Sequence, residues 1–274
     1  MAEYFRNRYH SHRPARFTPA SVPSGHVGIE LEVESRRNLD FRDLLQLLPD
    51  IQSPRRPIVE EDGSLSEWRG MEIVFPPFSP RQLTHKNGAV RRVMDALRNS
   101  VVEDENHIGM HYNYSTNGWS GAKKATFCAI IHNLPLRFLE QLAARDPEGY
   151  DERLPGHCQF AYFRNSRQFC GNRSNRIEVR FFGSTTDTQL LRLRLDFLAV
   201  VEAAAESAVW DDEMCRGIAA EYNVTYEEYH YVHSTTDASR AVASRVADTL
   251  FSDALASMKG KKWKALRQLW KEYK

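Results

Sequence analysis

The first residues with a possible chemical role are carboxylates in a short acidic segment near the N-terminus. The sequence Val27-Gly-Ile-Glu-Leu-Glu-Val-Glu34 alternates apolar and acidic residues. Because side chains alternate between the two faces of a strand, Glu30, Glu32 and Glu34 would share one face. Neighbouring carboxylates on that face would lie ~7 Å apart and repel by about 2 kcal/mol at an effective dielectric near ~20. Either water and salt on an open surface or a divalent cation in a cleft must offset this repulsion.

Three later strand-like segments also place polar residues opposite an apolar face. They are expected at 70–75, 109–115 and 175–182, and their polar faces carry Glu72, His111, Asn113, Glu178 and Arg180. If the apolar faces share one core, the polar faces share one concavity. Carboxylates, a histidine and surrounding arginines suit magnesium–nucleotide chemistry, because Mg²⁺ holds carboxylate and phosphate oxygens together while arginines bind the transferred phosphate.

Helices are expected between and after these strands. Apolar spacing predicts them at 41–48, 80–99 and about 187–210, with helical material at 123–144, broken at Pro135, and across much of 221–274. A further strand at 58–65 would run into a turn at Asp62-Gly63. Short, hairpin-like strand spacings combined with helices predict an α+β fold with a mainly antiparallel sheet. Helices would cover one face of this sheet and leave the polar face as a cleft.

The bulk composition limits the class of protein. The chain has 274 residues, of which 42% are hydrophobic, enough for a sizeable core. Its 37 basic and 36 acidic residues argue against a surface built wholly for nucleic acid. The four cysteines lack CxxC spacing, and no apolar segment approaches the length of a membrane span. We therefore expect a cytoplasmic protein with no membrane contact, in which nucleic acid is a less favoured partner.

We expect three parts along the chain. Residues 1–25 would form an irregular basic arm, 26–210 the catalytic core, and 211–274 a helical extension with a basic end, packed on the core. Near that end, lysines are interleaved with Trp263, Leu266, Leu269 and Trp270. This pattern favours a helix that packs its apolar face and solvates its lysines, over one that touches nucleic acid or membrane.

Five short motifs occur in order over residues 27–186. They are Gly28-Ile-Glu-Leu-Glu, Glu60-Glu-Asp-Gly-Ser, Met71-Glu-Ile-Val-Phe-Pro, Gly109-Met-His-Tyr-Asn and Ile177-Glu-Val-Arg-Phe. Together they resemble the amidoligase family, which belongs with glutamine synthetase and glutamate–cysteine ligase among the carboxylate–amine ligases. The resemblance implies a curved, mainly antiparallel sheet like the half-barrel of the glutamine synthetase catalytic domain, with helices packed on its outer face.

The resemblance also implies roles for individual residues. Divalent metal, Mg²⁺ or Mn²⁺, and through it the phosphates of ATP, would be held by Glu30, Glu32, Glu72, His111 and Glu178. Asp62 and Ser64 would lie near the substrate, and Arg180 would bind the substrate carboxylate or the acyl phosphate. His111, Glu178 and Arg180 would be the catalytic groups.

Nucleotide contacts are implied at Asn113 and in an arginine-rich stretch that contains Arg164, Arg173 and Arg176. The family's usual pattern has a second histidine where this chain has Asn113. An amide can hydrogen-bond a phosphate but carries no charge.

These roles predict an ATP-dependent carbon–nitrogen ligase acting on small-molecule or peptide carboxylates and amines. The carboxylate would attack the γ-phosphate to form an acyl phosphate, which the amine would then attack. Two alternatives remain open: a guanidino-type phosphotransferase on the same scaffold, and a catalytically retired binding protein whose basic termini contact nucleic acid or a protein partner. For single residues, Glu34 is expected to be a solvated strand end, and Arg180 could instead be the counter-ion of Glu178.

Overall fold

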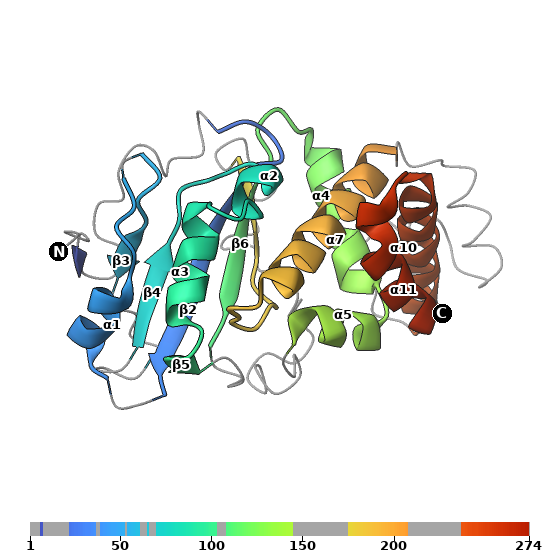
Figure 1. Ribbon diagram of the computed structural model, residues 1–274. Coiled ribbons are helices and arrows are strands. Elements are labelled where there is room, and N and C mark those ends of the chain that lie inside the picture. Colours follow the sequence, from blue (N-terminus) through green and yellow to red (C-terminus); the bar gives the residue numbers. More distant parts are fainter. Residues whose placement is uncertain are drawn as a thin grey trace. The chain divides into compact units, whose positions relative to one another are not determined.

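The computed structural model describes nine ranges of the chain, which form two compact units (Figure 1). The described residues are 6–7, 22–36, 39–52, 54–60, 65, 70–102, 108–144, 175–207 and 237–273. The first unit, here the sheet unit, comprises Met1–Gly118 and Leu142–Arg192. The second, the helical unit, comprises Trp119–Gln141 and Leu193–Lys274. The predicted domain boundary at residue 210 lies outside the described ranges.

An antiparallel sheet organises the sheet unit. Its central strands follow the order β3-β4-β2-β6-β7, and every neighbouring pair in this series is antiparallel. These strands are β2 (Val27–Ser35), β3 (Ile58–Glu60), β4 (Gly70–Val74), β6 (Met110–Ser115) and β7 (Arg176–Val179). The sheet and the helices around it confirm the predicted α+β class with a mainly antiparallel sheet.

Two very short strands extend this sheet. β5 (Val101–Val102) pairs with the C-terminal end of β2. β1 (Arg6–Asn7) pairs in parallel with β3, which places Arg6 opposite Val59. At these two residues the expectation of a wholly irregular N-terminal arm is wrong, because β3 leaves an edge to which another extended segment can hydrogen-bond.

The predicted alternation along β2 is confirmed. Ile29, Leu31 and Val33 are completely buried. Leu31 lies opposite Ile73 of β4 and Met110 of β6, so apolar side chains adjoin across three strands. Each such side chain contributes roughly 1.5–3 kcal/mol when it is fully buried. The apolar face of the sheet is therefore part of a continuous core.

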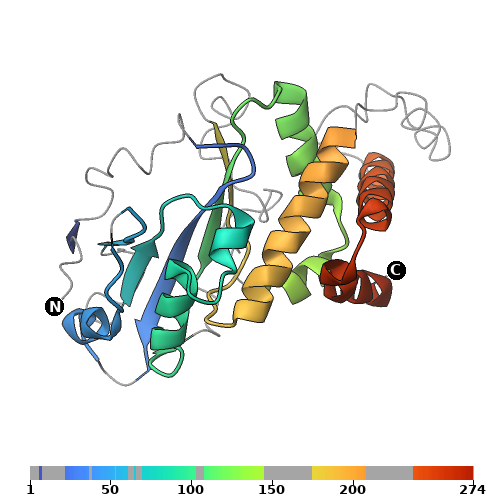
Figure 2. The same ribbon diagram turned by 45° about the horizontal axis from the view of Figure 1, so that its top comes forward.

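Helices α1 (Phe41–Leu47) and α3 (Ala89–Leu97) lie along one side of this sheet within the unit (Figures 1 and 2). α1 begins at a capping box, in which the Asp40 carboxylate accepts hydrogen bonds from the N–H groups of Arg42 and Asp43 at 2.7 and 2.9 Å. α3 turns its apolar positions inward, with Val90, Val93, Met94 and Leu97 buried. The predicted helix at 41–48 is confirmed to within one residue.

The predicted single helix at 80–99 is wrong, because the chain forms two helices there. α2 (Pro80–Leu83) starts at Ser79 with a capping box to Gln82 and ends after one turn. The Gly88 N–H then donates to the His85 carbonyl at 2.8 Å, and Gly88 starts α3. A Cβ at Gly88 would lie 2.7 Å from the Gln82 carbonyl oxygen, so the tight turn requires glycine. Apolar spacing could not reveal this break, since Leu83 and Val90 are buried on both sides of it.

The helical unit has an aromatic core. Its helices are α4 (Gly121–Asn133), α10 (Asp237–Ser257), the 3₁₀ turn η3 (Lys261–Trp263), α11 (Lys264–Glu272) and most of α5 (Leu136–Ala143) and α7 (Thr188–Ser207). Phe138 packs edge-on against Phe251 and Trp270, with ring centroids 5.6 and 4.8 Å away. The break before Pro135 is confirmed. No helix in the described ranges is long and apolar enough to cross a membrane.

The C-terminal helix has the predicted two-sided character. Trp263, Leu266 and Trp270 are buried, whereas the neighbouring lysines are exposed. The Trp270 indole N–H donates to the Ser252 hydroxyl of α10 at 3.3 Å. The prediction of a packed apolar face with solvated lysines is therefore confirmed.

Candidate metal centre

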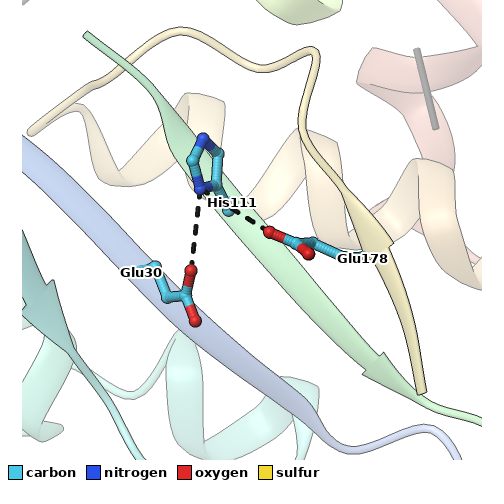
Figure 3. Close-up of side chains that lie close together, drawn as sticks. All are labelled: Glu30, His111 and Glu178. Carbon is cyan, nitrogen blue, oxygen red and sulfur yellow. Dashed lines mark ion pairs between the residues drawn. The ribbon is translucent and has the colours of Figure 1, made fainter. Parts of the chain in front are cut away.

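Three side chains from adjacent strands converge on the polar face of the sheet (Figure 3). Glu30 of β2 lies directly opposite His111 of β6, and Glu178 of β7 lies opposite Asn113, two residues further along β6. His111 Nδ1 is 3.6 Å from Glu30 Oε2 and 3.9 Å from Glu178 Oε1. One ligand atom from each of the three side chains lies within 4.8 Å of the others. The structure thus brings together three of the residues predicted to bind metal.

These three groups are shielded from water. Glu30, His111 and Glu178 are only 7%, 3% and 6% exposed. Two carboxylates no more than 4.8 Å apart repel by at least about 3.5 kcal/mol at an effective dielectric near ~20. Burial leaves little bulk water to screen this repulsion, so nearby positive charge must offset it.

Arg180 supplies part of that positive charge. Its Nη1 donates to Glu178 Oε1 at 3.0 Å, and its side chain remains 26% exposed. The alternative in which Arg180 is the counter-ion of Glu178 is confirmed at this contact. The predicted contact with a substrate would require the exposed part of the guanidinium.

Glu32 lies next to this group but takes a different position. The Gly109 N–H donates to Glu32 Oε2 at 2.6 Å, while Glu32 Oε1 lies 3.5 Å from His111 Nε2. Glu32 therefore approaches the imidazole nitrogen opposite to the one that faces Glu30 and Glu178. His111 Nε2 has no hydrogen-bond partner among the described residues, so Glu32 acts on the ring through its charge, from the side where residues beside metal ligands commonly lie.

Gly109 makes this arrangement possible. A Cβ at this position would lie 2.7 Å from His111 Nε2 and 3.2 Å from Glu32 Oε2. Any other residue would force the imidazole or the carboxylate to move. The glycine of the Gly109-Met-His motif is thus explained by the space that the site needs.

A second acidic row crosses the sheet beside this cluster. Glu32 of β2 lies opposite Glu72 of β4, and Glu72 lies opposite Glu60 of β3. All three are buried, and directly opposed residues have Cβ atoms about 4.5–5.5 Å apart. Glu60 was not predicted as a site residue, although it lies in the strand expected at 58–65. Its position within the acidic motif at 60–64 was the available signal.

The predicted solvation of Glu34 is wrong, since this residue is only 5% exposed. β4 and β5 flank this end of β2, which places Glu34 opposite both Gly70 and Val102. Strands on both sides exclude the water that a free strand end would meet. For Glu30 and Glu32, burial likewise excludes the open, solvated surface that was one of the two interpretations of the acidic segment.

The other predicted site residues divide into two groups. Asn113 lies on the same face as the cluster, and Arg176 lies opposite Ser115 at the start of β7. Four predicted residues are outside the described ranges: Asp62, Ser64, Arg164 and Arg173.

Asn113 has a polar atom that no described residue satisfies. Its Oδ1 is buried and has no hydrogen-bond partner in the described parts of the chain. Buried polar atoms are nearly always hydrogen-bonded, so this oxygen is open to a donor that the described residues do not supply. Asn113 is next to Glu178 across the β6–β7 pair.

No protein-family model and no curated protein matches this sequence. The chemistry of the site is therefore inferred from its own ligand atoms. Carboxylate oxygens are the usual ligands of Mg²⁺, and Mn²⁺ accepts an imidazole nitrogen beside them. The two carboxylates, the imidazole nitrogen and the unsatisfied amide oxygen fit a divalent cation with a polar ligand beside it.

Proposed function

We propose that this protein is an ATP-dependent ligase that joins a carboxylate to an amine. The observation that carries the proposal is the buried convergence of Glu30, His111 and Glu178 from three neighbouring strands. Support comes from the order of the five motifs that resemble the amidoligase family, and from the antiparallel sheet on which four of them lie. A curved half-barrel of the glutamine synthetase type is part of this proposal.

Mg²⁺ or Mn²⁺ would be held by Glu30, His111 and Glu178. Glu32 and Glu72 would provide further carboxylates beside these three ligands. The bound cation would supply Lewis-acid stabilisation of the negative charge that develops on the transferred phosphoryl group. This donor set has no soft sulfur ligand, in keeping with a site for a hard cation that binds nucleotide phosphates.

The protein's own side chains would position the reactants. Arg180, held by Glu178, would present its exposed guanidinium edge to the substrate carboxylate or to the transferred phosphate. Asn113 would hydrogen-bond the nucleotide from the neighbouring strand. Glu32 would hold the imidazole of His111 in place. The burial of these groups would keep water away from a reactive acyl phosphate.

The chemistry needs no side-chain nucleophile. A carboxylate oxygen of the substrate attacks the γ-phosphorus of ATP, the bond to the β–γ bridging oxygen breaks, and ADP leaves. The amine then attacks the acyl carbon, loses a proton, and expels inorganic phosphate. The net products are an amide, ADP and phosphate, so all atoms are accounted for.

The test is to incubate the protein with Mg²⁺, ATP and a pool of amino acids and amines, and to measure ADP and phosphate. Phosphate release that requires both a carboxylate and an amine would support the ligase. We expect Glu30→Gln to abolish it. The matched control is Glu272→Gln, which changes an exposed carboxylate on α11 and should leave turnover unchanged.

Other outcomes of this experiment would favour one of the two alternative functions. ADP without free phosphate would point to a guanidino-type phosphotransferase. If calorimetry detects no binding of nucleotide with Mg²⁺ or Mn²⁺, both catalytic functions are excluded and a binding protein on this scaffold remains.

A further inference from the structure

A second concavity lies in the sheet unit at the break between α2 and α3. It has a volume of about 220 Å³. Buried residues form its floor, namely Phe78, Gly88 and Ala89. Exposed residues form its rim, namely Arg55, Arg81, Gln82 and His85. The pocket therefore combines an apolar, glycine-containing floor with a polar rim.

Two arginines on this rim are unpaired among the described residues. Neither the Arg55 nor the Arg81 guanidinium has an ion pair or a side-chain hydrogen bond in the part of the chain that the structure describes. By contrast, Arg91 and Arg98, on and just after α3, both pair with Asp95. Guanidinium groups present several donors in a planar fork that matches phosphate and carboxylate oxygens.

The acceptor atoms of the rim are already occupied. His85 Nδ1 accepts a hydrogen bond from the Asn87 N–H at 3.3 Å, which leaves Nε2 as the donor of the ring. Gln82 Oε1 accepts from the N–H and the hydroxyl of Ser79 at 3.0 and 2.9 Å, which leaves its amide NH₂. The side chains of the rim thus offer donors and no open acceptor.

The backbone of the pocket, like its side chains, offers hydrogen-bond donors. The carbonyls of Gln82 and His85 accept hydrogen bonds from the N–H groups of His85 and Gly88 at 3.4 and 2.8 Å. The nine-residue helix α3 starts at Gly88, and no side chain caps its first N–H groups. The first bond within the helix runs from the Arg92 N–H to the Gly88 carbonyl at 3.0 Å, so the earlier N–H groups are left for another acceptor.

We propose that this pocket binds a phosphate group, either as inorganic phosphate or carried by a small organic molecule whose apolar part rests on Phe78. Two guanidinium groups that no described residue pairs with, together with several neutral donors, suit a dianion better than a carboxylate. The pocket is smaller than the ~300–1,000 Å³ that is usual for drug-sized ligands, so it is too small to enclose a whole nucleotide. It shares no residue with the metal centre proposed for ATP, so it is a separate site.

Titration of the full-length protein with three probes at constant ionic strength tests this site. The probes are inorganic phosphate, phenyl phosphate and phenol, followed by calorimetry and by the amide NMR signals of Gly88 and Ala89. We expect both phosphates to bind and shift these signals, and phenol to have no effect. Tighter binding of phenyl phosphate would assign the site to a phosphorylated organic molecule, whereas equal binding would assign it to inorganic phosphate.

Substitutions of the rim arginines test whether phosphate binds in this pocket. Arg55→Gln and Arg81→Gln should each weaken phosphate binding at least about tenfold, because each removes a charge-assisted hydrogen bond. The matched control is Arg91→Gln on α3, which removes the same charge outside the pocket and should leave affinity unchanged. Phosphate affinity that is no greater than chloride affinity, or that is unchanged in both rim variants, would overturn the proposal.

A further variant separates this proposal from the proposed ligase function. Glu30→Gln should lose divalent metal binding but keep phosphate binding in the pocket, whereas Arg81→Gln should show the reverse. Phosphate binding that disappears in Glu30→Gln would instead place the anion at the metal centre and overturn the pocket assignment.

Discussion

The candidate metal centre and the proposed phosphate pocket belong to the same unit but have opposite chemistry. The centre is built from buried carboxylates and one imidazole, so most of its polar atoms accept hydrogen bonds or coordinate cations. The pocket is built from exposed guanidinium, amide and imidazole groups around a helix N-terminus, so its open polar atoms donate. One site is suited to a cation and the other to an anion.

The two sites differ in burial as well as in the sign of their charge, and burial increases the energetic difference between them. Exposed arginines around the pocket are solvated in the absence of a ligand, and their positive charge costs the fold little. Carboxylates in the centre have lost most of their water and lie close enough to repel. The pocket therefore needs no ligand to be stable. In the centre, a bound cation would offset the repulsion between the buried carboxylates.

The largest predicted effect separates the proposed metal ligands from Glu32, the residue proposed to position them. Glu32→Gln keeps an oxygen for the Gly109 N–H but removes the charge beside His111 Nε2. We expect it to weaken Mn²⁺ binding by roughly 10–100-fold, the range found for groups that orient ligands, and Glu30→Gln to weaken it more. Calorimetry with Mn²⁺ measures both. Equal losses in the two variants would make Glu32 a ligand in its own right.

A smaller effect should follow from filling the space that the centre needs. Gly109→Ala would place a Cβ 2.7 Å from His111 Nε2, and overpacking of this kind costs about 1–3 kcal/mol of unfolding free energy. The matched control is Gly28→Ala on β2, where the nearest atoms would be 3.6 Å away, an ordinary contact. Urea unfolding of both variants measures the difference. If the two substitutions cost the same, steric crowding at His111 is not what requires Gly109.

The smallest predicted effect is the salt dependence of ligand binding, which compares the two sites directly. Raising NaCl from 0.05 to 0.5 M should weaken phosphate binding at the exposed pocket severalfold, because screening shortens to a few ångströms. Mn²⁺ binding at the buried centre should change less, since buried charges are screened less. Parallel titrations at the two salt concentrations check this. An equal salt dependence would mean that solvent reaches both sites alike.

Local features of this fold could be predicted from the sequence because they depend on neighbours along the chain. The alternation of β2 and the start of α1 after Asp40 follow from such short-range patterns. The helix break before Pro135 does too. The single helix expected at 80–99 failed because the turn at Gly88 is stabilised by contacts that apolar spacing does not encode.

Which side chains share a face of each strand follows from the sequence alone, since it depends only on a period of two residues. Which strands are neighbours, and in which register they pair, depends on long-range contacts in the folded chain. Pairing β2 with β6 sets Glu30 opposite His111, and pairing β3 with β4 brings Glu60 to Glu72. A slip of one residue in β6 would turn His111 to the apolar face. Long-range pairing thus converts a row of acidic residues into a candidate metal centre.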